Sequence, residues 1–464
     1  MSADRLRASL LLAVTLATLV HLVVGNALAQ GLGIAALGAY LLTQRGRLSG
    51  MARGLLWVAA GLTLVALWRH SAPGPLLFEA AGRFAFFATF VVALGLLRLP
   101  AYRSRLVRRC GQSMLLQPPG RRYPMLSLGS ALFGIILNIG VLNLFAAMIE
   151  KSNTLGAAQG RAWVQRARRR RMMLALLRGF SLAPLISPMG IGVAVVLSSM
   201  PGVAWRELAP YVLGAAVLIF LVGWLVDRLT GPHPPAAGAG REAPSLLPLG
   251  RFALLLAGIV TLVFCLAGWL EVRLPIAALL GAPLGAFGWL AWQRRRLGGL
   301  GLVAAGRSLH RQLPWLLAPT RNEIVVLGAA GYLGHLCVGL VDTASLAAAL
   351  TFLDTLGAWN AVLAMLLVMV LAQVGINPIV TVTLLAGILP ALAIEGLAPP
   401  LIGASLMVGW ALALMSSPMT ASMLILSRFT GVPSTRIGYR WNGAFLCTAI
   451  PLLAGWFLLA RFGS

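Results

Sequence analysis

A short polar cluster interrupts a long apolar stretch near the C-terminal end of the sequence, in "QVGINPIVTVTLLAGILP" at residues 373–390. It combines the amide of Asn377, the helix breaker Pro378 and the hydroxyls of Thr381 and Thr383. Proline in a membrane helix frees backbone carbonyls, which are tolerated only where protein or water covers them. Freed carbonyls can coordinate a cation, and the N-terminus of a half-helix can face an anion. The cluster therefore predicts a site for a solute and an ion inside a membrane.

Two related strings, each beginning with Ser-Pro-Met, occur in the two halves of the chain. The first is "SPMGIGVAVVLSSMPGV" at 187–203, and the second is "SPMTASMLILSRFTGV" at 417–432. Polar residues precede both strings, in "GVLNLFAAMI" and in "GINPIVTVTLL". Paired interruptions at corresponding places in two halves are typical of secondary transporters. The predicted substrate-binding residues are Asn138, Asn143, Ser187, Asn377, Thr381, Thr383 and Ser417. The predicted Na⁺ ligands lie at Asn143, Pro188, Asn377 and Pro418, where side-chain and backbone oxygens suit a hard cation.

The composition defines the elements that must position these residues. Of 464 residues, 59% are hydrophobic and only 10% are charged, whereas a soluble domain carries about a quarter charged residues. Apolar runs of about 20 residues, enough to cross a bilayer, recur from end to end. The sequence therefore predicts an all-α polytopic protein of the cytoplasmic (inner) membrane.

Arginine clusters between the apolar runs predict the orientation of the chain. The net charge is +26, and the clusters are "RGR" at 45–47, "YRSRLVRR" at 102–109, "RARRRR" at 166–171 and "RRR" at 294–296. Short basic loops of this kind mark the cytoplasmic side. The expected partners are therefore the lipid bilayer and a small solute, not nucleic acid.

About eleven transmembrane helices and two re-entrant helical hairpins are expected. The first hairpin, 125–149, has strongly basic flanks on both sides, and the second, 358–391, has acidic or neutral flanks. Both ends of each hairpin are therefore expected on one side, cytoplasmic for the first and external for the second. A simple helix with one misplaced loop remains the alternative for 125–149. The predicted crossings are 8–25, 28–43, 54–69, 82–98, 173–200, 208–226, 251–270, 274–292, 322–341, 400–428 and 441–460.

The crossings group into four regions. Residues 1–53 form N-terminal transmembrane helices, although their start could also be read as a signal peptide. Residues 54–226 form the first transporter repeat, and 251–464 form a second repeat of inverted orientation. A cytoplasmic linker, 227–250, joins them. The basic stretch 298–321 is expected along the membrane surface or in a loop.

This order resembles the ion transporter superfamily, particularly its divalent anion/sodium symporter branch. The resemblance covers the chain from about residue 54 to the end and rests on a hairpin followed by a broken helix, twice. It implies that polar hairpin tips and broken helices bind solute and sodium, and that a homodimer moves solute by an elevator motion. The Ser-Asn-Thr tip signature of that family is absent from both tips, and "KSNT" at 151–154 lies in a basic flank instead.

The leading functional hypothesis is a cation-coupled secondary active transporter of a small anionic solute. A flippase or exporter of a lipid-linked or larger substrate is one alternative, and an integral-membrane transferase is another. The eleven acidic residues are dispersed and the cysteines are scattered, so neither an enzyme nor a bound cofactor other than Na⁺ is expected. His335 and Asp342 are predicted to share a helical face and offer H⁺ as the alternative coupling ion. Arg178 is expected to snorkel to the cytoplasmic surface, and Gln373 could pack or bind.

Overall fold

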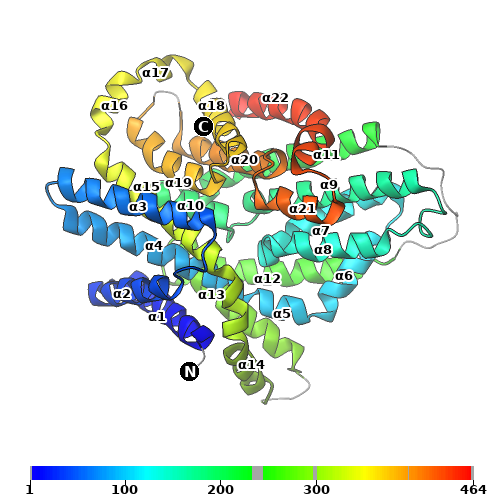
Figure 1. Ribbon diagram of the computed structural model, residues 1–464, viewed down its shortest axis with the longest axis horizontal. Coiled ribbons are helices and arrows are strands. Elements are labelled where there is room, and N and C mark those ends of the chain that lie inside the picture. The colour runs from blue at the N-terminus through cyan, green and yellow to red at the C-terminus, as the bar shows by residue number, and fades with distance from the viewer. Residues whose placement is uncertain (1–2, 232–243, 296–299, 395–396, 461–464) are drawn as a thin grey trace.

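Helices of many lengths make up the whole described part of the chain. The structure is a computed structural model that describes residues 3–231, 244–295, 300–394 and 397–460, and Figure 1 shows how its elements are arranged. The longer helices are α1 (Ala3–Val24), α2 (Ala27–Thr43), α3 (Gly50–Arg69), α4 (Pro73–Leu96), α6 (Arg105–Leu115), α7 (Pro119–Leu137), α8 (Gly140–Ser152), α9 (Ala162–Ile186), α10 (Ile191–Ser199), α11 (Trp205–Thr230), α12 (Leu247–Trp269), α13 (Leu274–Gln293), α14 (Leu300–Leu317), α15 (Arg321–Leu340), α18 (Trp359–Gln373), α19 (Pro378–Ile388), α20 (Pro399–Ser416), α21 (Ala421–Thr430) and α22 (Gly443–Ala460). Shorter elements are α5 (Arg98–Arg103), α16 (Thr343–Ala349), α17 (Phe352–Leu356), η2 (Ala318–Thr320), η3 (Leu389–Leu392) and the π-helical turn η4 (Arg436–Trp441).

Ten segments of the described ranges are long and apolar enough to cross a membrane. Each of them overlaps one of ten predicted crossings, although Ala162–Ser199 and Leu300–Leu340 begin well before the predicted 173–200 and 322–341. The remaining predicted crossing corresponds to α2, an apolar helix of 17 residues. The all-helical, polytopic fold class is therefore confirmed, whereas the count of eleven stays a prediction. Within the basic stretch 298–321, the described residues are helical in α14, η2 and the start of α15, so the loop alternative is wrong.

A helix, a turn and a second helix, followed by a broken helix, occur twice along the chain. Asn138, at φ +50°, ends α7 before α8 begins, and Gly375, at φ +94°, lies between α18 and α19. The broken helices follow as α9–α10 and α20–α21. In the first half α7 packs along α9, and in the second half α18 packs along α20. Re-entry of each pair through one membrane face, and the inverted orientation of the repeats, stay predictions.

A buried arginine joins the two halves. Arg178 of α9 was expected to snorkel to the surface, but that prediction is wrong because its side chain is buried. Its Nε donates to Asn442 Oδ1 at 3.0 Å, one Nη donates to the Gly223 carbonyl at 3.1 Å, and the guanidinium lies 4.5 Å from the centre of the Phe445 ring. Asn442 in turn donates to the Met415 carbonyl at 3.0 Å, so the arginine contacts the turn before α22 instead of solvent.

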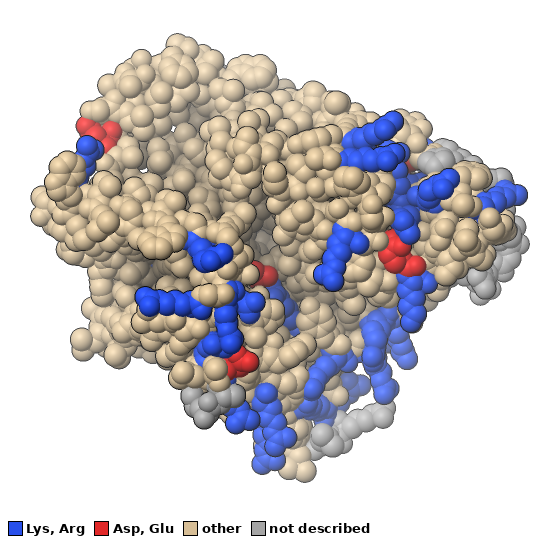
Figure 2. Space-filling view, in the orientation of Figure 1, with Lys and Arg blue, Asp and Glu red and all other residues tan. Residues whose placement is uncertain are grey.

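The predicted linker, 227–250, is largely outside the described residues. Its first four residues complete α11, which ends at Thr230, and its last residues begin α12 at Leu247. The arginine cluster at 294–296 also extends past the described residues, which stop at residue 295. Figure 2 shows that Lys and Arg gather over the lower and right-hand parts of the face in view, where α14, α6 and the start of α9 lie in Figure 1.

Candidate functional site

A cavity of about 500 Å³ lies where the interrupted helices of both halves meet the N-terminal ends of α3 and α15. This volume is in the range that ordinarily holds a small-molecule ligand. Most of its wall is apolar, with Phe180, Trp410 and several aliphatic side chains. The polar lining residues are Ser49, Arg98, Asn138, Ser187, Asn322, Glu323, Asn377 and Thr420.

The first half of the chain contributes polar groups that have no partner. Among the described residues, the Asn138 side chain makes no hydrogen bond, and the Ser187 hydroxyl is buried without one. Asn138 adopts φ +50° and ψ −137°, a conformation that few residues other than glycine and asparagine adopt. The following helices, α8 and α10, both begin without a side-chain cap. An unpartnered buried polar group costs free energy, and in this wall that applies to the Ser187 hydroxyl.

The second half contributes groups that are already bonded. Asn377 caps α19 by accepting from the Ile379 N–H at 2.9 Å, and its amide nitrogen lies 3.5 Å from Met51 Sδ. Ser417 donates to the Ala372 carbonyl at 2.6 Å and accepts from the Met419 N–H at 3.2 Å. Thr420 donates to the Ser417 carbonyl at 2.8 Å. The polar side chains around the second break are therefore bonded within the protein.

An ion pair stands at the wall formed by α5 and α15. Arg98 and Glu323 approach to 2.9 Å between nitrogen and oxygen, and both are partly buried. Beside them Asn322 accepts from the backbone N–H of Ser49, the residue that caps α3. The N-terminal ends of α3 and α15 thus lie at the cavity, and helix N-termini attract anions.

The structure brings some predicted site residues to the cavity and leaves others outside its lining. Asn138, Ser187 and Asn377 line it. Asn143 is exposed on α8. Ser417 is buried, and its hydroxyl is hydrogen-bonded within the protein. Pro188 and Pro418 lie in the turns that interrupt the two broken helices. Thr383 donates to the Ile379 carbonyl at 2.7 Å, and Thr381 is buried without a partner among the described residues. The binding roles of all these residues stay predictions.

The residues proposed for proton coupling do not form a pair on one helix. α15 ends at Leu340, so Asp342 lies beyond it and caps α16 by accepting from the Ala344 N–H. A side-chain hydrogen bond from Ser345 lowers the pKa of the Asp342 carboxyl. His335 lies 3.3 Å from Glu79 of α4 instead. The common face predicted for His335 and Asp342 is therefore wrong.

Gln373, which could either pack or bind, is occupied by packing contacts. It donates to the Met369 carbonyl and to Ser416 Oγ, and it accepts from the Tyr439 hydroxyl at 3.0 Å. All of these partners belong to α18 or to the second broken helix and the turn after it. Gln373 is thus part of the network that surrounds the second break.

Sequence reasoning missed five polar residues of the cavity wall: Ser49, Arg98, Asn322, Glu323 and Thr420. Arg98 is the last residue of the predicted crossing 82–98, and Glu323 is the second residue of the predicted crossing 322–341. One sequence feature could have indicated Asn322 and Glu323. They lie at the N-terminus of an apolar helix, and helix N-termini attract anions. At the cavity Asn322 contacts Ser49 and Glu323 contacts Arg98, each more than 200 positions away in the sequence.

Two solved transporter structures share this fold. The YdaH transporter of Alcanivorax borkumensis aligns with a TM-score of 0.59 over 88% of this chain and 98% of its own, at 17% identity. MtrF of Neisseria gonorrhoeae, described among a class of antimetabolite efflux pumps, aligns with a TM-score of 0.56 over 89% of this chain and 96% of its own, at 12% identity. No family model matches the sequence. No curated protein matches it either.

These likenesses span nearly the whole length of both transporters, and at such low identity they concern the fold. Together with the ten apolar spans, they identify a multi-pass helical membrane protein that has the fold of these two transporters. They do not show that the chain belongs to the ion transporter superfamily, to which it has only a resemblance.

Proposed function

We propose that this protein is a secondary active transporter of a small anionic solute, coupled to Na⁺ and working by an elevator motion in a homodimer. The single observation that carries the proposal is the cavity of about 500 Å³ between both sets of interrupted helices, with the unpartnered Asn138 and Ser187 at its wall. The fold shared with two transporters supports transport as the activity. The elevator motion and the dimer rest on the resemblance to the ion transporter superfamily.

The charge distribution supports an anion together with a cation. Uncapped helix N-termini at Gly140 and Ile191 offer N–H groups and positive dipole ends to an anion. The ends of α7 and α9, which meet the same cavity at Asn138 and Ser187, offer carbonyl oxygens to Na⁺. The formal charges of Arg98 and Glu323 cancel, so the wall that they form has no net charge that would repel either the anionic solute or Na⁺.

The size of the cavity favours a small solute over a lipid-linked one. The apolar wall, including Phe180 and Trp410, suits a solute with an apolar body and an anionic group. Export is a second candidate direction because MtrF, one of the two transporters that share the fold, is described as an efflux pump. Neither the cavity nor the fold favours the transferase alternative.

A binding screen followed by a flux assay tests the proposal. In detergent, a panel of small carboxylates, sulfonates and phosphonates is expected to contain members that raise the melting temperature in Na⁺ but not in choline buffer. Such an anion should stabilise Ser187→Ala less than the unchanged protein. It should keep its full effect in Ser405→Ala, whose hydroxyl is also buried but donates to the Ile402 carbonyl. In proteoliposomes the labelled anion should then move when a Na⁺ gradient is imposed.

Three outcomes contradict parts of the proposal separately. Stabilisation by organic cations alone would overturn the anionic substrate, and equal loss in the Ser405→Ala control would remove the cavity as the site. Full flux in Na⁺-free buffer under a proton gradient would replace Na⁺ by H⁺. Inside-out and right-side-out vesicles distinguish export from uptake.

A further inference from the structure

A second, smaller pocket lies away from the central cavity, between the beginnings of α7 and α9 and the end of α11. Its volume is about 50 Å³, and its polar lining consists of Arg122, Arg168, Arg171, Asp227 and Tyr123. A water molecule occupies about 30 Å³ in the liquid, so the pocket is larger than a single water molecule. None of its lining residues also lines the central cavity.

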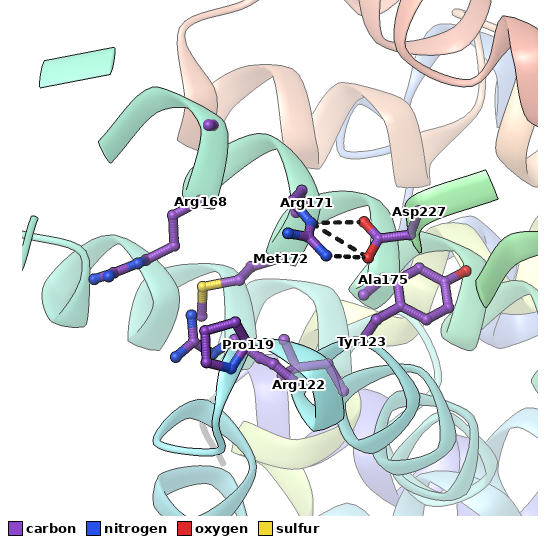
Figure 3. A pocket seen from close by; sticks show the side chains of 10 residues that line it. Pro119, Arg122, Tyr123, Arg168, Arg171, Met172, Ala175 and Asp227 are labelled. Atoms are coloured by element: carbon purple, nitrogen blue, oxygen red, sulfur yellow. Dashed lines mark hydrogen bonds and ion pairs between the residues drawn. The ribbon is translucent and has the colours of Figure 1, made fainter. Parts of the chain in front are cut away.

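The lining carries more positive than negative charge. Three arginines face one aspartate, so the formal charge of the lining is +2. Arg171 already uses Asp227, with Nη2 at 2.7 Å and Nε at 3.0 Å from the two carboxylate oxygens. Figure 3 shows Arg171 turned toward Asp227, while Arg122 and Arg168 extend to the other side of the pocket around Met172.

Arg122 and Arg168 have no carboxylate partner among the described residues. Arg122 donates from Nε to the Gln117 carbonyl at 3.0 Å, and Arg168 donates from one Nη to the Ala157 carbonyl at 3.0 Å. Their remaining N–H groups are available to a ligand. Burial, and after it the positive charges of Arg168 and Arg171, lowers the pKa of Arg122 to about 10.

Several guanidinium groups around a small pocket suit a tetrahedral oxyanion. Arginine binds phosphate oxygens through paired N–H donors, and these charge-assisted bonds are stronger than neutral ones. A bound anion would relieve the repulsion around Arg122 and would connect α7 with α9. Basic pockets between membrane helices on the cytoplasmic side commonly take phospholipid headgroups.

We propose that Arg122, Arg168 and Arg171 form a binding site for a phosphate group, separate from the transport cavity. The phosphate is carried either by the headgroup of an anionic phospholipid or by a small soluble phosphate. Arg122 and Arg168 supply the donors, and Asp227 fixes Arg171 beside them. The site does not depend on the proposed transport activity.

Binding to the full-length, delipidated protein in detergent tests the site. Native mass spectrometry measures binding of phosphatidylglycerol against phosphatidylcholine with the same acyl chains. Calorimetry measures inorganic phosphate and glycerol 3-phosphate against chloride at equal ionic strength. We expect saturable binding of one of the two sources, weakened at least tenfold in Arg122→Gln/Arg168→Gln. The matched control is Arg108→Gln on α6, an exposed arginine outside the pocket.

Each outcome decides the proposal. Preferential binding of phosphatidylglycerol assigns the lipid source, and saturable binding of phosphate or glycerol 3-phosphate assigns the soluble source. Affinities that fall equally in the double variant and in Arg108→Gln would overturn the site, as would the absence of saturable binding from both arms. If the double variant is not monodisperse, Arg168→Gln alone serves, because its side chain is half-buried at the surface.

Discussion

The break at 187–190 and the break at 417–420 begin with the same three residues and then diverge. The first continues Gly190-Ile191-Gly192, and the second continues Thr420-Ala421-Ser422. The two hydroxyls of the second break bond to carbonyls at the end of α20, Thr420 to Ser417 and Ser422 to Leu414, both at 2.8 Å. The glycines of the first break have no side chain that could do so.

The serine that opens each break reflects the same difference. Ser417 is a donor and an acceptor within the protein, whereas Ser187 has no partner among the described residues. A Cβ at Gly190 would stand 3.2 Å from the Ser187 carbonyl, closer than ordinary contacts, so glycine also permits the tight turn. We infer that the first break serves the ligand and the second serves the structure.

The tips differ in the same sense as the breaks. Asn138 does not cap α8, and its side-chain amide makes no hydrogen bond among the described residues. Asn377, in contrast, caps α19. The comparison therefore predicts that substitutions in the first half change affinity and that equivalent substitutions in the second half change stability.

The largest effect is expected from Asn138→Gly. Glycine tolerates the φ of +50°, so the change removes the amide without straining the backbone. Loss of hydrogen bonds to a charged solute should weaken binding roughly 10- to 100-fold, because each is worth about 1.5–3 kcal/mol. Calorimetry with the anion found by the screen measures it. Unchanged affinity would remove Asn138 from the site and weaken the comparison.

Ser417→Ala should lower stability. The change removes the buried hydroxyl that donates to the Ala372 carbonyl and accepts from the Met419 N–H. The loss of these two hydrogen bonds should cost about 1–3 kcal/mol. Thermal unfolding in detergent should show a clearly lower melting temperature, and solute affinity should change less than threefold. A large loss of affinity at unchanged stability would place Ser417 in the binding site instead.

Ser187→Ala should have the opposite profile. Removing a buried hydroxyl without partners leaves stability unchanged or slightly higher, while affinity should fall about tenfold, which corresponds to about 1.4 kcal/mol. The same two measurements on Ser187→Ala and Ser417→Ala form a direct test of the comparison. Identical profiles for the two variants would break it.

The smallest effect is expected at the second tip. Asn377→Ala removes the cap of α19 and should cost about 1 kcal/mol of stability. Asn377→Ser keeps an oxygen for the Ile379 N–H and should restore stability. If Asn377→Ser also binds the solute with unchanged affinity, Asn377 acts only as a helix cap. If its affinity falls tenfold, the amide nitrogen of Asn377 contacts the solute, and the second tip binds solute as the first is expected to do.

Much of the fold could be predicted because a membrane limits the choices. An apolar run long enough to cross must be helical, so the positions of α9, α12 and α13 follow from the printed residues. Interruptions such as Ser187-Pro188 and Asn377-Pro378 are equally visible, since proline breaks a helix wherever it packs. The composition, the helical class and the approximate places of the breaks were thus determined by the sequence itself.

Only the tertiary structure decided which interrupted segments share a cavity and which polar groups remain free there. Ser187 and Ser417 each begin the same Ser-Pro-Met string, but only Ser417 has a carbonyl, that of Ala372, brought by packing within reach of its hydroxyl. Arg98 meets Glu323, and Arg178 meets Asn442, across more than 200 residues. Hydrogen bonds extend only about 3 Å, so a side chain's partner depends on the packing of distant helices, which a local pattern does not contain.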